Sequence, residues 1–321
     1  MKPSINGREV VTVTVGGICL RGTYHRSQVD RSRTEQMAVL SLNHGFLPRA
    51  APGDSAVYWA DSLANSGYPF FRFDLPGLGD SDGDPPSPML DFVNTGGYAP
   101  VLSAAITELV NRFDLSGVVI MGHCAGSVTA LYSAAINKAC KGLILTDPYF
   151  FLTHERTSLR TELSRWSTWS RLGGVASDFV YYLKHIRLLA LGNRLPKNAN
   201  LKLIRCWRQL EANGLPILVM KAPALKGRGD KPRVGQFDYI EYLQKASSRS
   251  SRFSVRFIEG TNHSFADHVG RSGILQESEN WLNTYFPVAT FKERAILSSI
   301  PVPAHEDAQT LRSLGANVRQ G

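Results

Sequence analysis

Short apolar runs alternate with longer amphipathic stretches along most of this chain. The apolar runs predict eight β-strands, at residues 10–15, 18–25, 37–42, 70–73, 118–121, 143–145, 217–220 and 255–258. Apolar residues at helical spacing predict helices at residues 55–66, 99–112, 127–135 and 274–285. Gly16-Gly17 joins the first two strands into an antiparallel hairpin. Because helices separate most of the later strands, we predict an α/β fold with a mostly parallel eight-stranded sheet and helices on both faces.

One long segment interrupts this alternation. Residues 149–213 show no strand pattern and contain several aromatic residues, among them Trp166, Trp169 and Trp207. An insertion of this size predicts a helical cap over the carboxyl edge of the sheet, where open α/β sheets bind their ligands. The sequence therefore predicts a core in two parts, residues 1–148 and 214–287. The cap, residues 149–213, lies between these parts, and a Pro-containing tail, residues 288–321, follows them.

Composition places the chain among soluble proteins with a sizeable core, since 43% of its residues are hydrophobic and 20% are charged. No apolar run approaches the roughly 20 residues that a membrane span needs. The polar N-terminus lacks the apolar core of a signal peptide, so we expect a cytoplasmic protein. The four cysteines are widely scattered, which argues against a disulfide framework or a zinc site, and no metal or cofactor is expected.

The formal net charge of +9 has two interpretations. One is a well-solvated basic surface. The other is an anionic partner, such as coenzyme A, an acyl carrier protein or a carboxylated substrate. Nucleic acid is not expected, because the basic residues are spread along the chain without a binding motif.

The strongest chemical motif follows the strand at residues 118–121. There the chain continues Gly122-His123-Cys124-Ala125-Gly126 and enters a helix directly. This strand–turn–helix pattern predicts a nucleophile elbow with cysteine in place of the usual serine. The flanking Gly122 and Gly126 are needed because a side chain there would collide with the neighbouring strand or helix. The helix N-terminus favours the thiolate of Cys124. The alternative is a structural turn that holds a buried free cysteine.

With this elbow, residues 10–286 resemble the α/β-hydrolase superfamily. More closely, the chain is similar to the small hydrolases associated with bacterial exosortase systems, which can also carry cysteine at the elbow. The matching segments are Arg72-Phe73-Asp74 with Gly77-Leu78-Gly79-Asp80-Ser81, the Gly-His-Cys elbow, residues 143–148, and Asn262-His263-Ser264-Phe265.

The resemblance implies a general base after the last strand, which is the position of His263. A histidine there can deprotonate the thiol and later protonate the leaving group. His268, one helical turn further on, is the nearest competitor.

The same resemblance places an orienting acid after the strand at residues 217–220. Asp230 fits this position best, although its loop is longer than usual. Asp147, at the end of the preceding strand, and Asp238 are the alternatives. A Cys–His pair can also work without a strong acid, because a thiol ionises more easily than a hydroxyl.

For the oxyanion hole we expect the backbone N–H groups of Ala125 and Phe46. We interpret His44 as a loop residue that bonds the backbone, and the segment from Asp74 to Ser81 as a tight structural turn. Three basic residues near the site could meet an anionic substrate or simply be solvated: Arg49, Lys226 and Arg228.

A cysteine nucleophile changes the expected reaction. Its acyl intermediate is a thioester, which amines, thiols and water all attack. We therefore predict acyl transfer or thioester hydrolysis through acyl-Cys124, with a small-molecule acyl substrate such as a coenzyme A or carrier-protein thioester, of the kind used in specialised metabolism. The alternatives are a carboxylic-ester hydrolase and a catalytically silent ligand-binding protein. A redox-sensing thiol is disfavoured because Cys140 lies at the far end of the helix after Cys124. A polyester synthase normally needs a longer chain.

Overall fold

We describe the protein from a computed structural model that covers residues 7–29, 36–152, 195–223, 237–247 and 252–288. These residues fall in the first of the two units into which the chain divides, Met1–Val288. The second unit, Ala289–Gly321, lies outside the described residues, and with it nearly all of the predicted tail.

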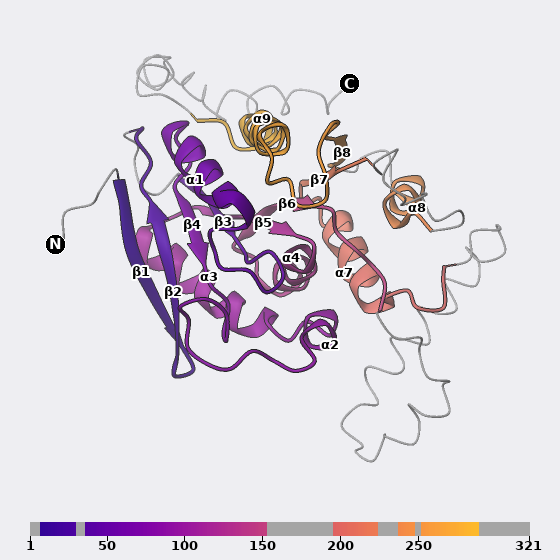
Figure 1. Ribbon diagram of the computed structural model, residues 1–321, viewed down its shortest axis with the longest axis horizontal. Coiled ribbons are helices and arrows are strands. Elements are labelled where there is room, and N and C mark those ends of the chain that lie inside the picture. Colours follow the sequence, from indigo (N-terminus) through magenta and orange to yellow (C-terminus); the bar gives the residue numbers. More distant parts are fainter. Residues whose placement is uncertain (1–6, 30–35, 153–194, 224–236, 248–251, 289–321) are drawn as a thin grey trace, which may run out of the picture. The chain divides into compact units, whose positions relative to one another are not determined.

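Eight strands form one sheet in the order β1-β2-β4-β3-β5-β6-β7-β8 (Figure 1). Strand β2 pairs antiparallel with both of its neighbours, and the pairs from β4 to β8 are all parallel. The predicted fold, a mostly parallel eight-stranded α/β sheet, is confirmed. The strands are β1 (Arg8–Val15), β2 (Ile18–His25), β3 (Met37–Ser41), β4 (Phe70–Phe73), β5 (Gly117–His123), β6 (Cys140–Thr146), β7 (Ile217–Lys221) and β8 (Phe253–Phe257).

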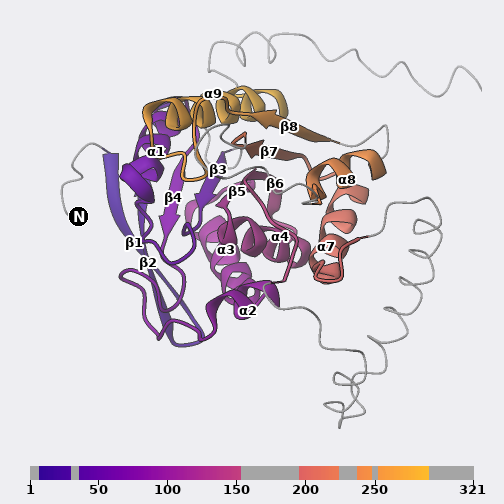
Figure 2. The same ribbon diagram turned by 45° about the vertical axis from the view of Figure 1, so that its right-hand side comes forward.

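Helices cover both faces of this sheet. On one face lie α1 (Ser55–Asn65) and α9 (His268–Tyr285), and on the other α3 (Ala99–Phe113), α4 (Ala125–Ile136) and α7 (Leu201–Ala212) (Figure 2). Two short helices, α2 (Met89–Asn94) and α8 (Tyr239–Ala246), and the 3₁₀ turn η3 (Pro52–Asp54) complete the described elements.

The core divides into two layers because side chains alternate across a strand. On the central strand β5, Val118 and Ile120 join the apolar cluster beneath α3, α4 and α7. Val119 and Met121 point the other way and join the cluster beneath α1 and α9. A strand that is buried on both faces has a continuous apolar run in its sequence, and residues 118–121 of β5 show this pattern.

The region predicted as a cap is only partly described. Residues 153–194 lie outside the described part, so the cap remains a prediction. The last portion of the segment, α7, packs on the body of the protein: Trp207 is fully buried, with its ring centroid 5.7 Å from that of Phe150 and 4.7 Å from that of Phe253.

The sheet brings distant parts of the chain to one edge. In a parallel sheet the carboxyl ends of the strands meet at the same edge, and loops there carry ligand-binding residues. Cys124 directly follows β5, Asp147 directly follows β6, and His263 lies in the loop after β8.

Candidate active site

Cys124 occupies a sharp turn between β5 and α4. Its backbone has φ 50° and ψ −112°, a conformation that residues with a side chain rarely adopt. The Cys124 N–H donates to the carbonyl of Thr146 at 3.0 Å, which ties the turn to β6. The thiol is half-buried, so reagents can reach it.

The two glycines around Cys124 are required by close packing. A Cβ on Gly122 would lie 2.5 Å from the carbonyl oxygen of Gly126. A Cβ on Gly126 would lie 2.7 Å from the carbonyl oxygen of Asn43, in the loop after β3. The second contact seats the loop of Asn43 directly against the first turn of α4.

His263 lies in the loop between β8 and α9 and contacts a carboxylate. Its Nδ1 is 2.8 Å from Oδ2 of Asp147. The other carboxylate oxygen, Oδ1, accepts the N–H of Ala222 at 3.1 Å, so both oxygens of Asp147 are held in place. Because Asp147 takes Nδ1, the imidazole turns Nε2 toward the thiol.

The protonation of His263 depends on both partners. Hydrogen bonds with Asp147 and with the Cys124 thiol raise the pKa of His263 to about 10, against the opposing effect of burial. The imidazole of His263 is therefore biased toward its protonated form.

Two more histidine rings, those of His123 and His44, form a row of tilted contacts with that of His263. The ring centroid of His123 lies 4.7 Å from that of His263 and 4.6 Å from that of His44. Burial holds the pKa of His123 well below its usual range and lowers the pKa of His44 to about 4. Both rings are therefore neutral at pH 7 and add no positive charge beside His263. His44 Nδ1, expected to bond the backbone, is buried with no hydrogen-bond partner among the described residues.

Phe46 and Ala125, the two residues expected to supply the oxyanion hole, line one small cavity. Ala125 begins α4, where a helix leaves its first N–H groups without intrahelical partners. The cavity has a volume of about 20 Å³, and ~10–15 Å³ is enough for one water-sized group such as an oxyanion. Apolar side chains, among them Leu75, Met89 and Val93, also line this cavity.

The three aspartates considered as the orienting acid differ in their contacts. Asp230, ranked first on the sequence, lies outside the described residues, and the His263 Nδ1 that it was expected to bind is taken by Asp147. Asp238 caps the N-terminus of α8 through Oδ1 and pairs with Lys221 at 2.8 Å through Oδ2. Within the described residues, the carboxylate that contacts His263 is that of Asp147, and the role of Asp230 stays a prediction.

Of the three basic residues considered for an anionic substrate, the structure describes Arg49. Arg49 pairs with Asp74 and, at 2.7 Å, with Asp80, so its guanidinium is already neutralised. Lys226 and Arg228 lie outside the described residues.

Sequence analysis did not single out Tyr149, which lies two residues beyond Asp147. Its hydroxyl is buried without a hydrogen-bond partner in the described part of the chain. Burial, and secondarily the charge of Cys124, raise the pKa of Tyr149, so it remains a neutral donor near the thiol. Nothing in the local sequence marks this position, because the residue follows an ordinary Asp-Pro step.

The described residues contain no group of three or more His, Cys, Asp or Glu placed to hold a metal ion. None of the described helices is long and apolar enough to cross a bilayer.

Comparisons with known proteins identify the family and the fold of this chain. A sequence profile of the alpha/beta hydrolase family matches residues 44–270. A comparison with curated protein sequences gives no match.

Among solved structures, three similar ones illustrate the fold. The alpha/beta hydrolase GrgF from Penicillium sp. sh18 is 18% identical with a TM-score of 0.52, and the alignment covers 88% of this chain and 99% of that one. Est1E from Butyrivibrio proteoclasticus, solved with bound ferulic acid, is 14% identical with a TM-score of 0.51 and coverages of 87% and 100%. An esterase from Pyrococcus furiosus is 11% identical with a TM-score of 0.55 and coverages of 87% and 91%. At these identities the likeness concerns the fold.

Proposed function

Because the chain belongs to the alpha/beta hydrolase family, we propose that it is an enzyme that transfers or hydrolyses acyl groups through a covalent acyl-Cys124 intermediate. One observation carries this proposal: the thiol stands on a strained elbow and shares hydrogen bonding with His263, whose other ring nitrogen is held by Asp147. This is the relation of nucleophile, base and orienting acid that acyl-transfer enzymes require.

In the first half of the reaction, the sulfur of Cys124 attacks the carbonyl carbon of an ester or thioester. The carbonyl oxygen becomes an oxyanion in the cavity beside Phe46 and Ala125, where backbone N–H groups stabilise it. When the oxyanion collapses, the bond to the leaving group breaks and the protonated His263 gives that group its proton.

Acylation then changes the role of His263. The thioester that forms no longer donates or accepts as the thiol did, so one of the two hydrogen bonds that raise the pKa of His263 is lost. The imidazole becomes a better base and removes a proton from water, a thiol or an amine as that acceptor attacks the thioester. Cys124 leaves with its electron pair, and the pair with His263 is restored.

The acyl donor that we propose is a small-molecule thioester of pantetheine, as in coenzyme A or an acyl carrier protein. A thioester donor and a thioester intermediate have similar energies, so exchange between them is nearly balanced. The net charge of +9 favours an anionic donor of this kind. The resemblance to exosortase-associated hydrolases adds no substrate to this proposal.

A carboxylic-ester hydrolase is the second candidate. It is favoured by two of the structural neighbours, one of which is an esterase and the other of which was solved with bound ferulic acid. The same three residues would serve both reactions, and only the donor would differ.

A redox-sensing role has little support. Cys140 pairs with Val118 at the opposite end of β5 from Cys124, and strands rise about 3.3 Å per residue. Burial also raises the pKa of Cys140 to about 12, which suppresses the thiolate that disulfide exchange needs.

Turnover of a matched panel tests the proposal. Acetyl, butyryl and octanoyl groups would be offered both as pantetheine thioesters and as 4-nitrophenyl esters to the wild-type protein and to Cys124→Ala. We expect turnover of at least one donor by the wild type and none above background by the variant. Preference for the thioester series supports the proposed pantetheine thioester donor, and preference for the esters supports the second candidate. Equal turnover by wild type and Cys124→Ala would overturn both.

A further inference from the structure

A fully buried carboxylate lies beside the expected oxyanion hole but outside the catalytic residues. Asp74 follows β4 and its side chain is 0% exposed. Its two oxygens accept four hydrogen bonds, which is about the full capacity of a carboxylate. The donors are the Asn43 side chain at 2.8 Å, the Arg49 backbone at 2.7 Å, the Asp80 backbone at 3.1 Å and the Arg49 guanidinium.

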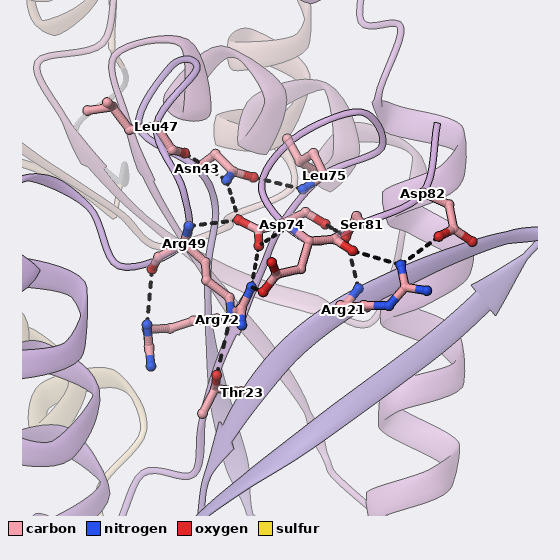
Figure 3. A network of polar contacts seen from close by, with 11 residues as sticks. Arg21, Thr23, Asn43, Leu47, Arg49, Arg72, Asp74, Leu75, Ser81 and Asp82 are labelled. Atoms are coloured by element: carbon pink, nitrogen blue, oxygen red, sulfur yellow. Dashed lines mark hydrogen bonds and ion pairs between the residues drawn. The ribbon is translucent and has the colours of Figure 1, made fainter. Parts of the chain in front are cut away.

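Two of these donor residues flank the loop that carries Phe46. Asn43 begins this loop and Arg49 ends it, so one carboxylate holds both ends (Figure 3). The Asn43 side chain also donates to the carbonyl of Leu47 at 2.9 Å and accepts the N–H of Leu75 at 2.8 Å. The loop is therefore fixed at three points around Phe46.

The contacts of this loop extend to the helix that follows Cys124. The carbonyl of Asn43 lies so close to Gly126 that a Cβ there would be 2.7 Å from its oxygen. Any shift of Asn43 would thus change the distance between the loop and the first turn of α4. The separation of the Phe46 and Ala125 N–H groups, which decides whether both can reach one oxygen, depends on this contact.

The segment from Asp74 to Asp82 is shaped to surround the carboxylate. A Cβ on Gly79 would lie 2.3 Å from the Asp74 carboxyl group, and Gly79 has φ 52°, so only glycine fits. Ser81 Oγ donates to the Asp74 carbonyl at 2.6 Å and accepts the N–H of Arg21 at 2.8 Å, which anchors the segment to β2 (Figure 3).

The negative charge of Asp74 is paired, so it does not oppose catalysis as a free carboxylate would. An unpaired carboxylate near the oxyanion would raise its energy by repulsion. Arg49 neutralises Asp74 directly. The hydrogen bonds between Asp74 and this loop are therefore charge-assisted, and the Asp74 carboxylate is itself paired.

From these contacts we infer that Asp74 is a positioning residue that sets the oxyanion hole by clamping the loop from Asn43 to Arg49. The inference rests on the proposed function, since only a reaction with an oxyanion needs this loop. The isosteric change Asp74→Asn turns one acceptor oxygen into a donor, so at least one bond to the loop is replaced by repulsion.

The test compares two rates on the same variants. Turnover of the best donor from the panel needs both the thiol and the oxyanion hole. Alkylation of Cys124 by iodoacetamide needs the thiol and His263 but forms no oxyanion. For Asp74→Asn we expect kcat to fall roughly tenfold to a hundredfold, less than the ~10²–10³ cost of losing a whole oxyanion donor, while the alkylation rate is unchanged.

The matched control is Asp82→Asn, the same substitution in the same segment. Asp82 pairs with Arg21 at 2.6 Å and does not contact the loop, so both rates should keep their wild-type values. Arg49→Gln, which removes the guanidinium but keeps the backbone N–H, should show the pattern of Asp74→Asn more weakly and decides the matter if Asp74→Asn does not fold.

Full turnover in Asp74→Asn, or in Arg49→Gln where Asp74→Asn does not fold, would overturn the inference. An equal fall of turnover and alkylation would also overturn it, because it indicates general disorder of the site. Wild-type protein that turns over no donor would overturn the proposed function and this inference with it. A full-rate Asp74→Asn on an active protein overturns the inference alone.

Discussion

The carboxylate of Asp147 and the imidazole of His263 lie 2.8 Å apart although 116 residues separate them in the chain. Asp147 follows β6, the strand beside the one that leads to Cys124, and the N–H of Ala222 holds its second oxygen. The contact fixes which nitrogen of His263 faces the sulfur, and the first two predictions follow from it.

Replacing Asp147 should impair catalysis without removing the nucleophile. In Asp147→Asn the amide no longer stabilises the imidazolium, so we expect kcat to fall on the order of 10²-fold, within the range of general acid–base contributions. Steady-state turnover measures this. Asp238→Asn is the matched control, since Asp238 caps α8, and it should keep wild-type turnover. A loss confined to Asp238→Asn would contradict the assignment.

The pH dependence of acylation should report the pKa of His263. Because hydrogen bonds raise that pKa to about 10, the imidazolium that protonates the leaving group persists up to about pH 10, and kcat/KM should fall as pH rises through that value. Removing the Asp147 hydrogen bond, the largest cause of the shift, lowers the pKa. The alkaline limb of Asp147→Asn should therefore lie at lower pH than that of the wild type, and coincident limbs would argue against the coupling.

How much of this site the sequence predicted depended on the range of the interactions. The elbow at Cys124 was predictable because its geometry is local: a buried strand, two glycines and a helix are adjacent in the chain. His263 followed from strand order and the family resemblance. The choice between Asp147 and Asp230 was not predictable, because it depends on the spacing of separate strands and on the path of a loop.

Longer-range packing also explains what was missed in the fold. The six residues of α2 are too few to show helical periodicity, yet Met89, Leu90 and Val93 line the cavity beside Phe46 and Ala125. Helix α7 belongs to the segment predicted as a cap, and Trp207 packs this helix against the body of the protein. The row of His44, His123 and His263 rings joins three loops or strand ends, and no spacing in the sequence indicates this row.

This row of histidines should make the stability of the protein sensitive to acid. The pKa of His44 is about 4 in the folded state and 6.5 in the unfolded state, so the unfolded state binds protons first and stability falls as pH decreases from 6.5 toward 4. Between pH 7 and pH 5 this one residue should account for a loss of about 2 kcal/mol in the free energy of unfolding.

Urea denaturation at pH 7 and pH 5 tests this on wild type and His44→Phe. The phenyl ring cannot be protonated, so the variant should lose less stability between the two pH values by about the amount that His44 contributes. The same loss in both proteins would show that His44 is not the group that titrates.

The elbow should store strain that its function requires. At φ 50° and ψ −112° a residue with a Cβ costs ~1–3 kcal/mol, and glycine avoids most of this at an entropic cost of roughly 0.5–1 kcal/mol. Cys124→Gly should therefore have a free energy of unfolding about 1 kcal/mol higher than Cys124→Ala. Denaturant titration of the two inactive variants compares them directly. If Cys124→Gly were the less stable of the two, the backbone at this position would not be strained.

The account depends most on the covalent intermediate. The direct measurement is the intact mass of the protein after brief mixing with the acyl pantetheine thioester that it turns over fastest, followed by acid quench. We predict that the wild type gains the mass of one acyl group, that hydroxylamine removes it, and that Cys124→Ala gains nothing. An equal adduct on Cys124→Ala, or an active wild type that never carries an acyl group at early times, would contradict the account.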